Sequence, residues 1–217
     1  MEFSVYHENT AAQGQKGKKD QCRSSNKCNG SYYLNFNKII SNWDNFDDGL
    51  IFFISIDGTH CPFEEPRPFS KKWSSHKLGG KPGVNYEIGL SINQSKVLWV
   101  SGPFPAGQYN DLQVFQQGLK DKIPVGKRAI ADDGYKGEAE YISTKNKFDP
   151  MEIAEFKEHV QARHETFNKH IKIFNCLTSK FRHGVTMHKA FFEAACVITI
   201  YEMENGCPLF DLYPFRI

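Results

Sequence analysis

Residues 50–60, LIFFISIDGTH, constrain the fold of this chain more than any other stretch. Six apolar residues and one serine run into a single carboxylate, Asp57, and Gly58 follows it. A short apolar run that ends at a turn signal predicts a buried β-strand, here residues 50–57. The sequence therefore predicts a strand that delivers Asp57 to the edge of a sheet, although Asp-Gly dipeptides are also common turn formers.

Length and composition allow one packed domain without indicating a partner. A chain of 217 residues with 40% hydrophobic residues can bury a substantial core. The net charge is only +2, but two segments are strongly basic. Residues 67–81 hold five Lys/Arg and no acid, and residues 163–189 hold six Lys/Arg and one acid, Glu165. These segments are either solvated surface or contacts for nucleic acid.

The sequence indicates an intracellular chain that does not cross a membrane. Its first ten residues lack the apolar core of a signal peptide. No apolar run approaches the roughly 20 residues that a membrane helix needs. We therefore expect the six cysteines to be free thiols, and the spacing of Cys22 and Cys28 does not match a zinc site.

Hydrophobic periodicity predicts four strands and three helices after residue 50. The strands are residues 50–57, 84–93, 97–102 and 128–131, with a turn at residues 93–96 and a break in the sheet at residues 103–107. The first helix is capped by Asn110 or Asp111 and runs through Leu119. A long helix starts at Pro150 and carries an apolar stripe as far as Phe174. The last helix, residues 187–204, is apolar on most sides and is expected to be buried.

This order of elements is typical of an α/β fold. The first and fourth strands are free to lie side by side as parallel neighbours, about 4.8 Å apart. Asp132 directly follows the fourth strand. Asp57 and Asp132 are therefore predicted to project from neighbouring strand ends, where the ligands of open α/β sheets collect.

A third acid, Glu165, completes a candidate metal site. It is the only acid of its basic segment, and it can reach the sheet edge from the long helix. Two hard divalent cations need several converging carboxylate oxygens, and Arg163, Lys169 and Lys172 would attract a phosphate backbone beside them. The alternative is that the aspartates form turns and that Glu165 is a solvated surface residue.

The motifs around these acids resemble those of a known family. They are Asp57-Gly58-Thr59-His60, Ala131-Asp132-Asp133-Gly134-Tyr135 and Arg163-His164-Glu165, with connecting pieces such as Gly83-Val84-Asn85-Tyr86-Glu87 and Phe181-Arg182-His183. Together they are similar to the DDE transposases of the PIF/Harbinger type, also described as the DDE superfamily endonuclease domain. The resemblance implies a ribonuclease-H-like α/β fold, with a mixed sheet flanked by helices. It also implies a nuclear enzyme that cleaves and joins DNA with two Mg²⁺ or Mn²⁺ ions.

The resemblance also assigns roles to residues. The family's catalytic, metal-binding acids match Asp57, Asp132 and Glu165. Asp111 and Asp133 are alternative ligands, although helix capping is the expected role of Asp111. Candidate DNA contacts are His60, His76, Lys77, Arg163, Lys169, Lys172 and Arg182. The expected partners are DNA, a separate DNA-binding accessory protein and further copies of the chain.

We expect three parts along the chain. Residues 1–49 form a partly disordered, basic segment, in which residues 10–31 are polar and residues 31–44 are an edge strand or a short helix. Residues 50–212 form the ribonuclease-H-like endonuclease domain, and residues 213–217 form a tail. Family members usually carry an N-terminal helix-turn-helix-like DNA-binding region, which is not evident here. The alternative function is therefore that of a truncated or domesticated, catalytically silent module that binds DNA or protein.

Overall fold

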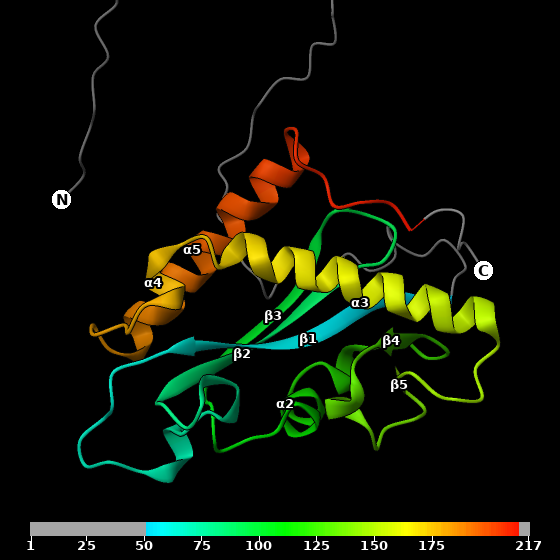
Figure 1. The fold of residues 1–217 in the computed structure, drawn as a ribbon. Helices are drawn as coiled ribbons and strands as arrows, with labels where there is room; N and C mark the ends of the chain where they lie inside the picture. The colour runs from blue at the N-terminus through cyan, green and yellow to red at the C-terminus, as the bar shows by residue number, and fades with distance from the viewer. Residues whose placement is uncertain (1–50, 213–217) are drawn as a thin grey trace, which may run out of the picture. The chain divides into compact units, whose positions relative to one another are not determined.

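The computed structural model describes residues 51–212. The predictions for residues 1–49 and 213–217 fall outside the described residues. Residues 51–212 form a five-stranded mixed sheet with helices on both of its faces (Figure 1). The strand order β3-β2-β1-β4-β5 is consistent with a ribonuclease-H-like α/β fold, so the predicted fold class is confirmed.

The sheet contains antiparallel and parallel pairs. Its strands are β1 (Phe52–Pro62), β2 (Gly83–Ser91), β3 (Val97–Pro105), β4 (Arg128–Ile130) and β5 (Ile142–Ser143). β1, β2 and β3 are paired antiparallel, whereas β4 lies parallel to β1 and β5 parallel to β4. The predicted parallel pairing of the first and fourth strands is confirmed, with Ser55 opposite Ile130 at the end of their common register.

Two strands are longer than predicted. β1 does not end at Asp57 but continues through Gly58 to Pro62, because β2 stays hydrogen-bonded to it over that whole stretch. The alternative that Asp57 and Gly58 form a turn is therefore wrong. β3 likewise continues through the predicted break as far as Pro105, still paired with β2. The two-residue strand β5 was not predicted, because so short a segment has no periodicity to detect.

The helices begin close to their predicted positions. They are α2 (Asp111–Gln117), α3 (Met151–Ile171), α4 (Asn175–Thr178) and α5 (Val185–Glu204). Asn110, and not Asp111, caps α2: its Oδ1 accepts a hydrogen bond of 2.8 Å from the Gln113 backbone N–H, and Gln113 Oε1 accepts one of 3.0 Å in return. The long helix α3 stops at Ile171, three residues before the predicted end of its apolar stripe, and Phe174 precedes the separate short helix α4.

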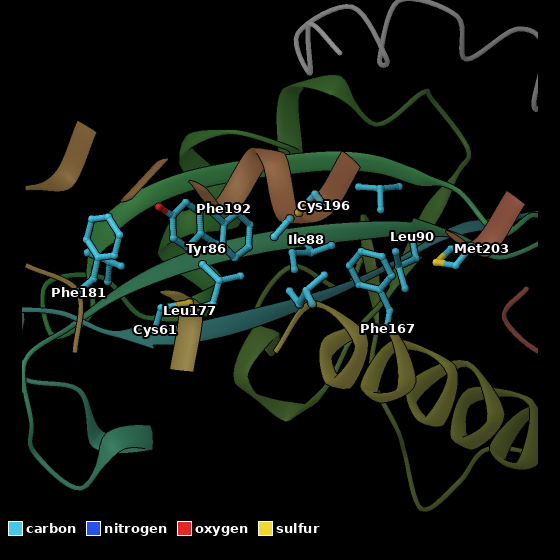
Figure 2. Close-up of a cluster of buried hydrophobic side chains, with 14 of the residues drawn as sticks. Cys61, Tyr86, Ile88, Leu90, Phe167, Leu177, Phe181, Phe192, Cys196 and Met203 are labelled. Atoms are coloured by element: carbon cyan, nitrogen blue, oxygen red, sulfur yellow. The ribbon is translucent and has the colours of Figure 1, made fainter. Parts of the chain in front are cut away.

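The larger core cluster lies between the sheet and the helices α3, α4 and α5 (Figure 2). β2 contributes Tyr86, Ile88 and Leu90, all without solvent exposure. The ring of Tyr86 stacks on that of Phe192 from α5 with centroids 3.7 Å apart. Because helices cover both faces of the sheet, β2 is buried along its whole length.

A second cluster lies on the opposite face, between the sheet and α2, and includes Ile54, Ile56, Phe115 and Leu119. The two clusters hold β1 between them. One expectation fails here: α5 is not buried on most sides, since four of its large apolar side chains are 44–54% exposed. Among residues 51–212, no helix is long and apolar enough to cross a membrane.

Candidate functional site

Asp57 occupies the point where β1 loses its neighbour on one side. The parallel register with β4 ends at Ser55, so Asp57 lies two residues beyond it while β2 still pairs on the other side. Ser55 and Asp57 share one face of the strand because side chains alternate, and both contact α3. Asp57 Oδ2 accepts a hydrogen bond of 2.8 Å from Asn168 Nδ2, and Asp57 Oδ1 accepts one of 2.7 Å from the Gly58 backbone N–H.

Asp132 follows β4 at the same rim. It precedes a short 3-10 turn, Asp133–Tyr135, and its Oδ1 accepts a hydrogen bond of 2.9 Å from the Gly134 backbone N–H. Tyr135 is fully buried and anchors this turn in the core beside α2. Asp132 itself is exposed, so its carboxylate faces the solvent at the strand end.

The helix α3 packs over the end of β4 and carries the third acid, Glu165. Gln161 Nε2 donates a hydrogen bond of 3.3 Å to the carbonyl of Ala131, which fixes the helix over the end of β4. A small cavity of about 90 Å³ opens there. It is lined by Ser55, Ile56, Asp57, Ile130, Asp132, Gln161, His164 and Glu165. The three acids singled out from the sequence thus border one cavity, although they come from β1, from the end of β4 and from α3.

The electrostatics of the cavity disfavour a free carboxylate at Asp57. The pKa of Asp57 is raised to about 6, chiefly by burial; the charge of Lys77 opposes this rise, and the charges of Asp132 and Asp111 contribute to it. A bound cation stabilises partly buried carboxylates that repel one another, because it compensates their negative charge. Carboxylate oxygens are also the donors that Mg²⁺ and Mn²⁺ prefer.

The donor chemistry therefore fits divalent cations, but the carboxylates are not gathered around one point. Within residues 51–212, no group of three or more His, Cys, Asp or Glu side chains lies in a metal-holding arrangement. Both oxygens of Asp57 accept hydrogen bonds from the protein. Asp132 and Glu165 are exposed, so their carboxylates border the cavity from its open side.

The two alternative acids lie in different surroundings. Asp111 approaches from the α2 side: a Cβ on Gly58 would lie 2.5 Å from its Oδ1, and a Cβ on Gly134 would lie 3.1 Å from its Oδ2 and 3.0 Å from Asp132 Oδ1. Asp111 thus lies close to the backbone that follows Asp57 and to the turn that follows Asp132. Asp133 instead forms an exposed ion pair with Lys136 at 2.7 Å.

Lys77 links the loop before β2 to this group of acids. Its Nζ donates hydrogen bonds of 3.0 Å to the Gly58 carbonyl and 3.3 Å to Asp111 Oδ2. Asn85 Nδ2 donates to the other oxygen of Asp111 at 3.3 Å. Lys77 therefore supplies the positive charge next to Asp111 in this structure.

The predicted basic contacts separate into exposed and buried side chains. Lys169 and Lys172, at the end of α3, and Arg182, before α5, are exposed, as is His76. His60 is 4% exposed, its Nδ1 lies 2.6 Å from Ser75 Oγ, and burial lowers its pKa to about 4. His60 therefore carries no positive charge at neutral pH.

Arg163 does not reach the surface. It is 3% exposed and donates three hydrogen bonds to main-chain carbonyls: 2.5 Å to Ser91, 2.7 Å to Gln94 and 3.0 Å to Phe210. These bonds fasten α3 to the turn between β2 and β3 and to the C-terminal segment. The prediction of a DNA contact at Arg163 is therefore corrected, because its guanidinium already binds protein carbonyls.

Sequence reasoning missed two residues that border the acids. Asn168 holds Asp57 and lies three residues after Glu165, so helical spacing alone places both on one side of α3. His164 is buried, its Nδ1 lies 3.1 Å from Ser55 Oγ, and burial together with the charge of Arg163 lowers its pKa to about 3. No spacing rule identifies the pairing of Ser55 with His164, because their separation in the chain is 109 residues.

Comparison with known proteins identifies one family. The family model for the DDE superfamily endonuclease matches residues 56–199, which include all three acids and every residue that lines the cavity except Ser55. The search of curated proteins and the search of solved structures gave no significant match.

Proposed function

The chain belongs to the DDE superfamily endonuclease family, and we propose that it is a metal-dependent enzyme that cleaves and joins DNA phosphodiester bonds. We further assign it to the PIF/Harbinger type of DDE transposase, with residues 50–212 as the catalytic domain and the nucleus as its compartment. The observation that carries the proposal is the shared cavity of Asp57, Asp132 and Glu165. Membership of a nuclease family and three acids that border one cavity together favour phosphodiester chemistry over a purely structural role.

Asp57, Asp132 and Glu165 would hold two divalent cations, Mg²⁺ or Mn²⁺, with Asp111 available as a further oxygen donor. When bound, such ions activate an attacking hydroxyl and stabilise the leaving oxygen. The protein's own groups set the geometry: Asn168 and the Gly58 N–H orient the carboxylate of Asp57. The buried, neutral His164 covers the inner side of the cavity without adding charge.

Exposed basic side chains would bind the DNA backbone. Lys172 lies seven residues after Glu165, which corresponds to about 10 Å along a helix, so it can contact a phosphate next to the one being cleaved. Its charge also reaches His60 and Cys61 at the far end of β1. Lys169, Arg182, His76 and Lys77 complete the proposed set of contacts, and a separate DNA-binding protein would select the site.

The test is Mn²⁺-dependent nicking of a supercoiled plasmid by the full chain and by three isosteric variants, Asp57→Asn, Asp132→Asn and Glu165→Gln. Each variant should lose activity by about a hundredfold or more, because the cation loses an oxygen ligand at the reacting phosphate. Glu152→Gln is the matched control, since Glu152 is an exposed acid in the first turn of the same helix. Equal nicking by all variants would reject the three-acid site.

One observation favours a second candidate function, that of a catalytically silent DNA-binding module. The acids do not form a metal-holding group within residues 51–212, and Lys77 already lies against Asp111. This candidate predicts no nicking by the wild type, together with salt-dependent DNA binding that Lys172→Ala weakens. Calorimetric titration with Mn²⁺ distinguishes the two functions. The enzyme should bind Mn²⁺ and lose that binding in Asp57→Asn, whereas the silent module should show no Mn²⁺ binding that depends on Asp57.

A further inference from the structure

Another cavity lies beside the acids, between the end of β1 and the segment that joins β3 to α2. Its volume is about 420 Å³, within the range of about 300–1,000 Å³ that is typical of ligand sites. Gly134 lines it, and a Cβ at Gly134 would lie 3.0 Å from Asp132 Oδ1 and 3.1 Å from Asp111 Oδ2. The cavity therefore begins directly beside the proposed cation site. We call it the His60 cavity; its lining includes His60, His76, Tyr109, Asn110, Asp111 and Gln113.

The hydrogen bonds around His60 decide which of its ring nitrogens carries the proton. Its Nδ1 lies 2.6 Å from Ser75 Oγ. Ser75 is fully buried, and its Oγ already accepts a hydrogen bond of 3.1 Å from the Leu78 backbone N–H. Among residues 51–212, the Ser75 hydroxyl has no acceptor other than His60 Nδ1, so it donates its proton there. The neutral His60 ring therefore carries its own proton on Nε2.

The Nε2–H group of His60 is a donor without a partner in the described part of the chain. His60 is 4% exposed, and the small part of it that is open lines the His60 cavity. Buried polar groups are nearly always hydrogen-bonded in folded proteins. A donor that is buried, unpaired and directed to a cavity therefore marks the position of an acceptor atom on a ligand.

Asn110 and Gln113 add donors of the same kind. The Oδ1 atom of Asn110 accepts a hydrogen bond from the Gln113 backbone N–H, and the Oε1 atom of Gln113 accepts one from the Asn110 backbone N–H. These bonds fix the orientation of both amide groups, so each side chain keeps its NH₂ group for a ligand. The His60 cavity thus presents three N–H donors from three side chains.

The lining of the His60 cavity disfavours a phosphate and favours a neutral, flat ligand. It includes the carboxylate of Asp111 and no lysine or arginine. Of its two histidines, His76 is exposed to solvent, and His60 is uncharged because burial lowers its pKa to about 4. Tyr109 supplies an aromatic ring, which packs edge to face on Phe104 with centroids 6.0 Å apart. A nucleobase fits this lining, because every base has acceptor atoms on its edges and a face that stacks on aromatic rings.

We propose that the His60 cavity binds one nucleobase that has left the DNA duplex next to the phosphate held at the acids. The inference rests on the proposed function, since it takes DNA as the ligand. Successive nucleotides of a strand are about 3.4 Å apart along a duplex, so a nucleotide whose phosphate lies near Asp132 can place its base beyond Gly134. The base must rotate out of the stack, because a paired base does not expose its edge and its face together. His60 Nε2 and the NH₂ group of Gln113 then donate to its acceptors.

The test is fluorescence anisotropy of the full chain in EDTA with labelled duplexes that differ at one bulged nucleotide. The bulge carries one of the four bases or an abasic sugar. The wild type should bind at least one base about tenfold more tightly than the abasic sugar, through stacking and hydrogen bonds to that base. Both kinds of duplex have the same number of phosphates, so the ratio of the two affinities removes the contribution of the backbone.

A matched pair of variants tests the cavity. Gln113→Glu keeps the capping box, of which glutamate is a usual member, but replaces the NH₂ donor by a carboxylate oxygen; the preference for the base should fall below about threefold. Gln117→Glu adds the same charge to the same helix at an exposed position outside the lining, and should keep the wild-type preference. His60→Asn should also lose the preference, because its side chain still offers Ser75 an acceptor but places no donor at the position of Nε2.

The inference is overturned if no base is preferred over the abasic sugar, or if Gln113→Glu and Gln117→Glu keep the same preference. These results are separate from those of the nicking assay, because EDTA removes the cation. A protein that nicks plasmid DNA but shows no preference would overturn the role of the His60 cavity and leave the proposed enzyme standing. A protein that prefers the base but does not nick would support the cavity and reject the enzyme.

Discussion

Replacing Arg163 by methionine should destabilise the fold without weakening DNA binding by the folded protein. Arg163 donates three hydrogen bonds to carbonyl oxygens and is 3% exposed. Hydrogen bonds from a charged group contribute about 2 kcal/mol each. Burial lowers the pKa of Arg163 from 12.5 to about 10, which corresponds to an opposing cost of roughly 3 kcal/mol. The net contribution of the side chain is therefore about 3 kcal/mol.

For a domain of this size, such a loss lowers the melting temperature by about 6–12 °C. The assay is thermal unfolding followed by circular dichroism, with fluorescence anisotropy on a short duplex as the DNA readout below the melting temperature. Lys169→Met, on the exposed side of the same helix, is the control and should change stability by less than about 0.5 kcal/mol. If Arg163→Met kept the wild-type melting temperature but bound DNA more weakly, the structural role of Arg163 in joining α3 to the hairpin of β2 and β3 would be refuted.

Two further substitutions test the surroundings of the acids. Glu87 is fully buried, and burial raises its pKa from 4.5 to about 8. Between pH 4.5 and 8 only the unfolded chain releases this proton, so the stability of the fold should fall as the pH rises through that range. Glu87→Gln keeps the acceptor for Trp99 Nε1. In urea titrations its stability relative to the wild type should increase toward pH 8, by up to about 1.4 kcal/mol per pH unit. A stability difference between the two proteins that does not change with pH would contradict this. Gly58→Ala places a Cβ 2.5 Å from Asp111 Oδ1 and should cost about 1–3 kcal/mol. If Asp111 serves the cation site, nicking should fall as in Asp111→Asn, whereas unchanged nicking would remove Asp111 from the site.

Local sequence signals predicted the elements whose partners are close in the chain. The hairpin of β2 and β3, the start of α2 at Asn110 or Asp111 and the start of α3 at Pro150 depend on residues within a few positions of one another. The parallel pairing of β1 with β4 followed from the order of strands and helices. These features are fixed by periodicity, turn chemistry and capping, which act over short distances.

Local sequence signals could not predict which polar and apolar side chains of a helix are buried and which are exposed. Arg163 and Lys169 are both basic residues of the same helix, yet one is buried against three carbonyls and the other is exposed. The difference depends on where the turn after β2 and the segment at Phe210 pack, and those segments are 47 to 72 residues away. The same reason explains why the exposed side of α5 was missed.

The sequence by itself determined that a buried strand carries Asp57, that Asp132 follows a neighbouring parallel strand, and that Glu165 lies on a long helix. Only the tertiary structure decided that β1 continues past Asp57, because β2 supplies hydrogen bonds where β4 has ended. It also decided that α3 crosses this rim so that Asn168 holds Asp57 and Glu165 borders the same cavity. Side-chain identity and spacing are local properties of a chain, whereas the placement of three acids at one cavity depends on contacts between segments 30 to 111 residues apart.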